Sequence, residues 1–404
     1  MPCCSRTASR PPAAEILRPR RILPVIILAQ FAGTALWFAG NAVIGDLQRE
    51  LGLPDAALGY VTSAVQLGFI AGTLVFAFFA LADVYSPRIV YFVCSLAGAA
   101  ANAAAAALAG DLASLLAWRF AAGFFLAGIY PVGMKIASGW FQHDLGKALG
   151  FSVGALVLGT AFPHLLKAIG QALPWQAVLL GTSALAVCGG IAMLALVPDG
   201  PYLPRGGKFD PRALATIFRA PRFRASAFGY FGHMWELYAF WAFVPVVLAA
   251  QAAEPLNVSL WTFLVIAVGS LGCFVGGLVS MRTGSAPVAF AQLFASDACC
   301  VLSPLLFYYA PTPLYLMFLL FWGVSVVGDS PQFSALNAAN APPGLVGSAL
   351  TIVNCIGFSI TIPSIELLNW AAPRIGAPWL FLLLVPGPLL GLVALRPLLR
   401  ERPC

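Results

Sequence analysis

Two ionisable side chains that can bind and release protons lie near the middle of one long apolar stretch. His233 and Glu236 are three residues apart within 225–251. In a helix this spacing places both on one face, one turn apart. An imidazole changes charge near neutral pH, so it could share a proton with the carboxyl group. The pair predicts a proton-binding site; the alternative is that neutral Glu236 and His233 only bridge to another helix, where Asn354 is available.

A third ionisable side chain, Arg119, interrupts the apolar stretch 113–137. Placing such a group at membrane depth costs roughly 2.5–3.5 kcal/mol on insertion scales, so it needs a compensating role. Arg119 could bind an anion or support proton movement. It could also anchor two helices through hydrogen bonds, and the sequence leaves these alternatives open.

The composition indicates which solvent surrounds these groups. The chain has 404 residues, of which 60% are apolar and 9% are charged, and its mean hydropathy is +0.89. Soluble domains average about 25% charged residues. So few polar residues cannot cover a water-facing surface, which predicts that lipid surrounds much of the chain. This excludes a soluble enzyme, a disordered regulator and a nucleic-acid binder.

Apolar stretches of the length needed to cross a bilayer, roughly 20 residues, repeat along the chain. Backbone groups in lipid must be satisfied within each segment, and the alternation of a membrane barrel is absent, so helices are expected. The sequence predicts twelve of them, at 22–44, 56–80, 88–108, 113–137, 147–170, 175–197, 225–251, 259–281, 287–308, 313–334, 346–369 and 377–396.

The distribution of Lys and Arg predicts the orientation. With both termini on one side, that side receives 17 of the 22 basic residues and the opposite side receives three. The positive-inside rule places the termini and the middle loop in the cytoplasm. The short loops between the spans favour a bacterial inner membrane. The predicted units are a cytoplasmic segment, a six-helix bundle, the loop, a second six-helix bundle and a tail, at 1–21, 22–197, 198–224, 225–396 and 397–404.

The two halves of the chain echo each other. Gly123, Gly128 and Pro131 recur 200 residues later, and the following predicted helices carry Pro163 and Pro363 at corresponding positions. Internal repeats with Gly- and Pro-interrupted helices are typical of secondary transporters. Helix hinges are expected at Gly123, Gly128, Pro131, Gly154, Gly159, Pro163, Gly323, Gly328, Pro331 and Pro363.

Two motifs carry a family resemblance. The fourth predicted helix contains Leu115-x-x-x-Arg119-x-x-Ala122-Gly123, and the loop after the second contains an acid and a late basic residue, Asp83 and Arg88. With the repeat, these motifs resemble the major facilitator superfamily of secondary transporters. The loop departs from the family pattern because Phe79 and Ser86 replace its two glycines, and its copy at 277–284 has Met281 in place of the acid.

The resemblance implies an all-α membrane protein of two pseudo-symmetric six-helix bundles around a central cavity that opens alternately to each side. Trp residues away from the span ends fall on the helices that the family uses to line this cavity. Aromatic walls with a few polar groups suit a small organic molecule; the alternative is that these Trp only pack. The expected lining is Trp37, Asn41, Gln66, Arg119, Tyr130, Trp235, Tyr238, Trp322, Gln332 and Asn354.

Four charged residues near the cytoplasmic ends of helices could form a gate that breaks on opening: Asp83, Arg88, Lys135 and Asp329. The pair Glu236 and His233 is the predicted proton-coupling site. Asp297 receives no role.

The expected function is alternating-access transport of a small solute, an organic anion or other small organic molecule, coupled to protons. A proton-driven drug or metabolite exporter is the first alternative, although Ala155 stands where the antiporter motif has Pro. A sensor or a membrane enzyme is the second, and no catalytic motif supports an enzyme. The expected partners are the solute, protons and the bilayer, with no cofactor, metal or nucleic acid, and the chain is expected to be a monomer.

Overall fold

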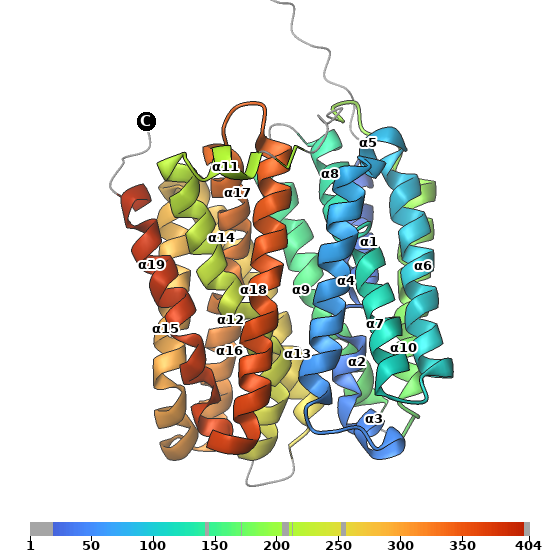
Figure 1. Cartoon of the computed structure of the whole chain (residues 1–404), viewed down its shortest axis with the longest axis vertical. Helices are drawn as coiled ribbons and strands as arrows, with labels where there is room; N and C mark the ends of the chain where they lie inside the picture. Colours follow the sequence, from blue (N-terminus) through green and yellow to red (C-terminus); the bar gives the residue numbers. More distant parts are fainter. Residues whose placement is uncertain are drawn as a thin grey trace, which may run out of the picture.

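Long apolar helices run side by side along one axis of the molecule (Figure 1). The computed structural model describes residues 19–141, 145–170, 172–203, 210–211, 213–251 and 256–399. The predicted segments 1–21, 198–224 and 397–404 therefore lie partly outside the described residues, and the predicted boundaries between units stay predictions.

The first half of the described chain forms one bundle, drawn blue to green in Figure 1. Its helices are α1 (Ile22–Thr34), α2 (Ala39–Ala42), α3 (Ile44–Leu51), α4 (Ala57–Phe78), α5 (Leu81–Val84), α6 (Pro87–Leu108), α7 (Leu112–Leu126), α8 (Tyr130–Trp140), α9 (Leu145–Ile169) and α10 (Gln176–Leu196).

The second half forms the other bundle, drawn from yellow-green to red. It contains α11 (Ala213–Ile217), α12 (Pro221–Gln251), α13 (Val258–Ala267), α14 (Gly269–Thr283), α15 (Ser285–Tyr309), α16 (Thr312–Gly328), α17 (Ser330–Asn340), α18 (Val346–Ile375), the 3-10 helix η1 (Ala377–Leu384) and α19 (Pro386–Leu399).

Eleven helical stretches of the described chain are long and apolar enough to cross a membrane, and Ile22–Thr34 is a shorter apolar helix. The predicted all-helical fold of two six-helix bundles is confirmed. The first predicted span differs in detail, because residues 35–38 and Val43 are not helical: the first interruption separates α1 from α2, and the second separates α2 from α3.

The duplication is visible in how the helices break. The fourth span is interrupted at 127–129, between α7 and α8, and the tenth is interrupted at Asp329, between α16 and α17. Gly128 and Pro131 flank the first break as Gly328 and Pro331 flank the second. Pro is tolerated in the first turn of a helix, because the N–H it lacks would have no partner there.

The duplication is equally visible in how the helices pack. A Cβ added at Gly123 would lie 2.2 Å from the carbonyl oxygen of Val65, and one at Gly323 would lie 2.0 Å from that of Val265. The two contacts are offset by 200 residues at both partners. Gly123 and Gly323 are therefore close-packing positions within α7 and α16, where only a residue without Cβ lets the backbones approach so closely.

The other expected hinges lie within unbroken helices. α9 continues through Pro163 and α18 continues through Pro363. Gly159 meets the first span, since an added Cβ would lie 2.2 Å from Oγ1 of Thr34, whereas one at Gly154 would have only ordinary contacts. Among the expected hinge positions, Gly128 and Pro131 lie at the break between α7 and α8, and Gly328 and Pro331 lie at the break between α16 and α17. A hinge at the remaining positions stays a prediction.

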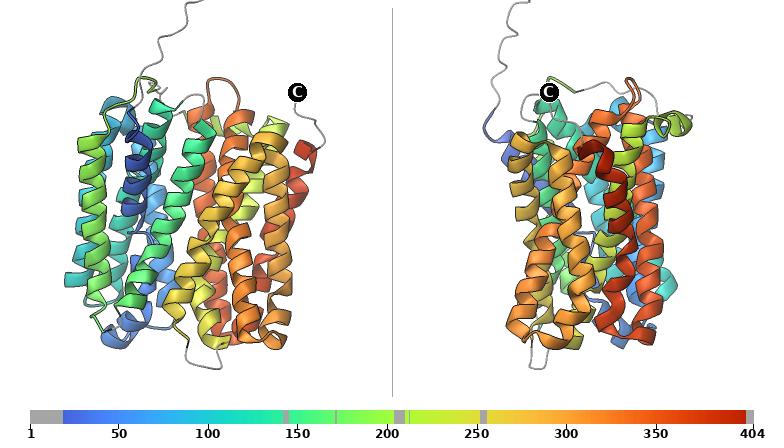
Figure 2. Two further views of the ribbon diagram at one scale, coloured as in Figure 1. Left: turned by 180° about the vertical axis from the view of Figure 1, so that it is seen from behind. Right: turned by 90° about the vertical axis from the view of Figure 1, so that its left-hand side faces the viewer.

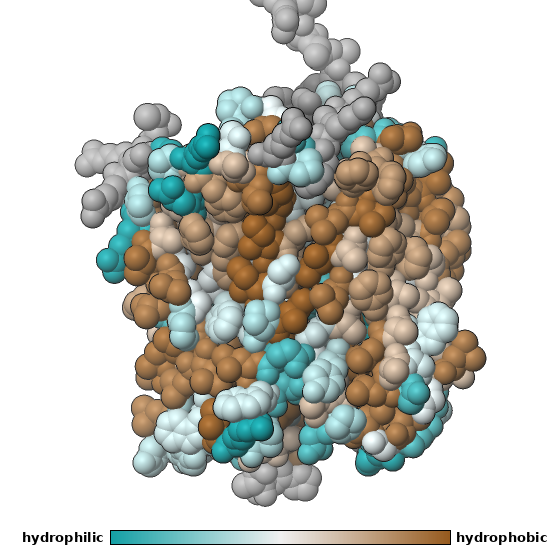
Figure 3. All heavy atoms as spheres, viewed as in Figure 1, coloured by the Kyte–Doolittle hydropathy of each residue, from teal (hydrophilic) through white to brown (hydrophobic). Residues whose placement is uncertain are grey.

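The surface suits a bilayer. Apolar residues cover most of the face in Figure 3, and the most hydrophilic residues gather toward its two ends. Large apolar side chains such as Phe78, Val93 and Leu271 are more than half exposed. The start of α1 and the end of α19, near the two ends of the described chain, lie toward the same end of the bundles (Figures 1 and 2). That end is called the termini face below, and α3 marks the opposite face.

The two bundles meet mainly along two seams: α4 packs against α18, and α9 packs against α13 and α14. In the first seam, Ser63 Oγ donates to Glu366 Oε1 at 2.7 Å, and the rings of Phe69 and Phe358 lie 4.4 Å apart. In the second, the rings of Phe151 and Phe274 are 5.3 Å apart. These contacts hold the seams of the bundles together.

Candidate functional site

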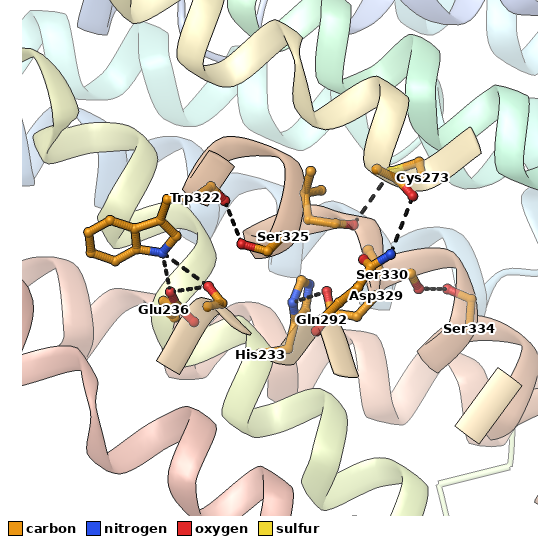
Figure 4. A network of polar contacts seen from close by, with 12 residues as sticks. His233, Glu236, Cys273, Gln292, Trp322, Ser325, Asp329, Ser330 and Ser334 are labelled. Atoms are coloured by element: carbon orange, nitrogen blue, oxygen red, sulfur yellow. Dashed lines mark hydrogen bonds and ion pairs between the residues drawn. The ribbon is translucent and has the colours of Figure 1, made fainter. Parts of the chain in front are cut away.

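The carboxyl group of Glu236 is enclosed within the second bundle (Figure 4). Its Oε1 accepts hydrogen bonds from Ser296 Oγ at 2.5 Å and from Trp322 Nε1 at 2.8 Å, and the thiol of Cys300 lies 3.4 Å away. These donors come from α15 and α16, while Glu236 belongs to α12. One carboxyl oxygen therefore joins three helices, and the side chain is only 1% exposed.

His233 is paired with a different acid. Its Nδ1 lies 2.9 Å from Oδ1 of Asp329, and both side chains are 1% exposed. Asp329 occupies the break between α16 and α17. The expectation that His233 shares its proton with Glu236 therefore differs from the structure. The two residues are neighbours on α12, but His233 faces the break in the tenth span and Glu236 faces α15 (Figure 4).

Aromatic rings enclose the imidazole. The rings of Tyr230 and Phe333 lie 6.0 Å and 5.6 Å from that of His233. His233 Nε2 and Asp329 Oδ2 have no hydrogen-bond partner among the described residues. A proton that moves between the two partners changes no net charge, whereas an additional proton adds one positive charge beside the break.

The four residues expected to form one cytoplasmic cluster are divided among separate contacts. Lys135 Nζ binds Asp83 Oδ1 at 2.5 Å, and Arg88 Nε lies 3.9 Å from Asp199 Oδ1. Asp329 instead lies with His233. A helix that ended at the membrane surface would have exposed Asp329, but the break turns its side chain into the bundle.

Arg119 holds the interrupted first span. Its guanidinium donates to the carbonyl oxygens of Leu36 and Trp37 at 2.8 Å and 2.7 Å, and to Asn102 Oδ1 at 2.6 Å. Residues 35–38 are not helical, so these carbonyl groups need partners from elsewhere. The contacts match the anchoring alternative. An anion-binding role for Arg119 stays a prediction, and the side chain is fully buried beneath Gly40, where an added Cβ would lie 3.2 Å from Arg119 Nε.

Three of the expected cavity residues, Trp37, Gln66 and Tyr238, meet between the bundles, and a fourth, Asn41, lies within the first bundle. Trp37 Nε1 donates to Gln66 Oε1 at 3.2 Å, and Asn41 Nδ2 donates to Thr62 Oγ1 at 2.7 Å. The ring of Trp37 lies 5.7 Å from that of Tyr238 in the second bundle. Trp37, Asn41, Gln66 and Tyr238 are all buried.

The other expected cavity residues are dispersed. Trp322 binds Glu236, and Trp235 Nε1 donates to the carbonyl oxygen of Leu383 in η1 at 3.4 Å. Asn354 accepts from Tyr230 at 3.3 Å. The backbone of Tyr130 accepts from Gln30 at 3.1 Å, and Gln332 is buried near the start of α17. The ten residues therefore do not line one common space.

Several hydrogen-bond partners in the site and in the seam could not be identified from the sequence. Ser296 and Cys300 lie one turn apart on α15 and face Glu236, but a Ser and a Cys in an apolar stretch give no distinctive signal. Glu366 is a further residue that the sequence did not single out. It accepts from Ser63 across the seam and from Asn369, whose amide also donates to the Ala56 carbonyl at 3.0 Å.

Comparison with known families decides the assignment. Residues 25–363 match the family described as the Major Facilitator Superfamily. The chain belongs to this superfamily. It is therefore an integral membrane protein of a family of transporters, whose members bind small molecules. No curated protein matches the sequence.

Solved structures of superfamily members share the fold. The structure titled proton:xylose symporter XylE has a TM-score of 0.73 at 13% identity, with 94% of this chain and 96% of that chain covered. The human organic anion transporter MFSD10 has a TM-score of 0.67 at 14% identity, and a mutant of the nucleoside transporter NupG has 0.69 at 14%. Each of these two comparisons covers 94% of this chain and 100% of the other. At these identities the likeness shows the fold alone.

Proposed function

We propose that this superfamily member couples the transport of a small organic molecule to protons. Its termini face would lie in the cytoplasm of a bacterial inner membrane, as the distribution of basic residues predicts, and it would act as a monomer. The observation that carries the coupling is the contact of His233 with Asp329 at the break between α16 and α17, 2.9 Å apart and one turn from buried Glu236.

A net charge on the buried pair of His233 and Asp329 is unfavourable in free energy, so the protonation of this pair influences which conformation is stable. Uncompensated charge in an apolar interior costs several kcal/mol, and Asp329 lies where the tenth span is interrupted. Binding or releasing a proton would change the relative free energies of two arrangements of α16 and α17. A ligand shifts such an equilibrium only by its differential affinity for the two states.

Glu236 would be the second proton-binding group. Its Oε1 accepts from Ser296 and Trp322, so it is held between three helices that must keep or break these bonds together. A change from Glu236 to Gln keeps an acceptor oxygen at this place but cannot release a proton. The substitution therefore separates the structural role of the side chain from its titration.

The test uses the full-length protein in proteoliposomes that contain a pH-sensitive dye. Benzoate, benzamide, xylose and uridine are added outside in turn, and proton movement and solute uptake are recorded. We expect one solute to move with protons in the wild type, and the proton signal to be lost in Glu236→Gln and Asp329→Asn while solute exchange remains. The variant Trp370→Phe, at a side chain that is 57% exposed, is the matched control.

The sign of the dye signal discriminates between uptake and export. Protons that move with the solute indicate a symporter, and protons that move against it indicate the export alternative. Uptake that is independent of the proton gradient, and equal in Glu236→Gln and the wild type, contradicts the coupling. A solute that binds but is never translocated favours the sensor alternative.

A further inference from the structure

An aromatic layer joins the two bundles between α4 and α18, beside the break in the first span. We define it as Trp37, Phe38, Gln66, Phe69, Tyr238, Trp241 and Phe358, which are all less than 10% exposed. The first four belong to the first bundle and the last three to the second. None of the seven side chains carries a charge at neutral pH.

The ring contacts cross from one bundle to the other. Trp37 stacks on Phe358 with centroids 5.6 Å apart and planes inclined by 25°, and Phe69 lies 4.4 Å from the same ring. Tyr238 lies 5.3 Å from Phe358. Any opening of the bundles at this level must separate Trp37 from Phe358, and it would forfeit the stacking and the burial of both faces.

A flat aromatic ligand would replace the ring contacts that are lost when Trp37 and Phe358 separate. An aromatic molecule placed between Trp37 and Phe358 presents a face to each ring, so both keep an aromatic neighbour. A bulky, non-planar ligand cannot restore these offset-stacked contacts at a comparable separation.

Two buried hydrogen-bond donors in the layer have no acceptor. Nε2 of Gln66 and Nε1 of Trp241 are without partners among the described residues, and both side chains are 0% exposed. The amide of Gln66 is already fixed at the edge of Trp37, because its Oε1 accepts from Trp37 Nε1. Unmade hydrogen bonds of buried donors are costly, so these groups favour a ligand with acceptor atoms.

The charged side chains beside the layer already have partners. Arg119, behind the break, gives three hydrogen bonds to Asn102, Leu36 and Trp37, and only its Nε, which lies beneath Gly40, has no partner among the described residues. Glu366 accepts from Ser63, which lies one turn from Gln66 on α4. A charged ligand in the layer would exchange its hydration for aromatic faces and neutral donors, at a large desolvation cost.

We propose that the aromatic layer is the substrate site and that its substrate is an uncharged, planar molecule with a hydrogen-bond acceptor, such as an aromatic amide or ketone. The ring would lie between Trp37 and Phe358, and the acceptor would receive hydrogen bonds from Gln66 Nε2 or Trp241 Nε1. The use of this site in transport rests on the proposed function, but the binding itself does not require a proton gradient.

The experiment measures binding to full-length protein in detergent with four matched probes. Benzamide, benzoate and benzylamine carry the same ring with no charge, a negative charge and a positive charge, and cyclohexanecarboxamide keeps the amide without the aromatic ring. Thermal stabilisation and quenching of Trp fluorescence are recorded during titration to tens of millimolar. For ligands of this size, a Kd on the order of millimolar is expected. We expect benzamide to bind about tenfold more tightly than each of the other three.

Variants locate the binding. Gln66→Leu is expected to weaken benzamide about tenfold, because it removes the donor at almost unchanged volume. Trp37→Phe should retain binding and Trp37→Leu should lose it, whereas Trp370→Leu, at a side chain that is 57% exposed, should change nothing.

Other outcomes overturn the proposal. Preference for benzoate that is lost in Arg119→Lys makes the ligand an anion, and preference for benzylamine that is lost in Glu236→Gln makes it a cation. If cyclohexanecarboxamide binds as tightly as benzamide, ring stacking does not contribute to binding. If the protein melts cooperatively but benzamide does not stabilise it, the aromatic layer is not a binding site for this ligand. The transport assay also offers xylose, which has no planar ring for the stacking site, so loss of the aromatic site leaves proton coupling testable and the two proposals fail separately.

Discussion

The imidazole of His233 lies 2.9 Å from the carboxylate of Asp329, and both side chains are almost completely buried. Asp329 separates α16 from α17, whereas at the corresponding break of the first bundle the residue 200 positions earlier is Ile129. The duplicated halves thus share the break but differ in its chemistry. Only the second half has an ionisable group at this position, so only the second bundle can bind or release a proton at its break.

Removing either partner alone leaves a buried polar or charged group without its counterpart. We expect His233→Gln and Asp329→Asn each to lower the free energy of unfolding by about 3–5 kcal/mol. The double variant should lose less than the sum of the two, by a coupling free energy of about 1–3 kcal/mol. Unfolding by SDS titration of the purified protein measures this. Strictly additive losses would show that the two side chains do not depend on each other.

Arg119 offers a test of its anchoring role. Lys has the same charge but lacks the planar fork that reaches the Leu36 and Trp37 carbonyl groups and Asn102 together. Arg119→Lys is therefore expected to destabilise the protein by about 2 kcal/mol, as measured by SDS titration. Arg374→Lys is the matched control, since Arg374 is exposed and lies over the ring of Trp370. Equal effects at the two positions would contradict an anchor at the first span.

The repeated glycine contacts predict equal penalties in the two halves. Gly123→Ala and Gly323→Ala would each place a Cβ within 2.2 Å of a carbonyl oxygen on the neighbouring helix. Overpacking of this kind typically costs about 1–3 kcal/mol. Gly277→Ala should be nearly neutral, because nothing lies within 4 Å of its added Cβ. Thermal unfolding of the three variants provides the comparison, and a large loss in Gly277→Ala would refute it.

The fold was predictable because its signals are local. Apolar length gives the spans, and the recurrence of Gly128 and Pro131 at Gly328 and Pro331 gives both the duplication and the two breaks. The break at 35–38 was not predicted. It contains no Gly or Pro. Two of its carbonyl groups, those of Leu36 and Trp37, accept from Arg119, which lies 82 positions further along from Trp37.

The site was less predictable because its pairs are distant in sequence. His233 and Glu236 were recognised by type and depth, but spacing on one helix could not show that their partners are Asp329 and Ser296. The rotation of each side chain toward a particular neighbour depends on helix packing. The role of Glu366 could not be predicted for the same reason, since its partner Ser63 lies 303 positions away.

The seam between α4 and α18 is tight toward the face opposite the termini, and this predicts how it can be opened. Gly59 of α4 receives the side chain of Asn369 of α18, and an added Cβ there would lie 2.4 Å from the amide carbon. Asn369 also donates to the Ala56 carbonyl at 3.0 Å, next to the bond between Ser63 and Glu366. Gly59→Leu would insert a wedge at this contact.

We expect Gly59→Leu to favour the arrangement that is open at that face, because the side chain fits only when α4 and α18 separate. Labelling of an Asn354→Cys variant, in a background without other reactive cysteines, by a membrane-impermeant maleimide on that face should accelerate about tenfold, which corresponds to a shift of about 1.4 kcal/mol. Gly45→Leu is the matched control on α3, since an added Cβ there meets nothing within 4 Å. Unchanged labelling in Gly59→Leu, or equal acceleration in the control, would show that Gly59 and Asn369 do not close the seam. Glu366→Gln should accelerate labelling less than Gly59→Leu, because its amide oxygen can still accept from Ser63 and no wedge is introduced.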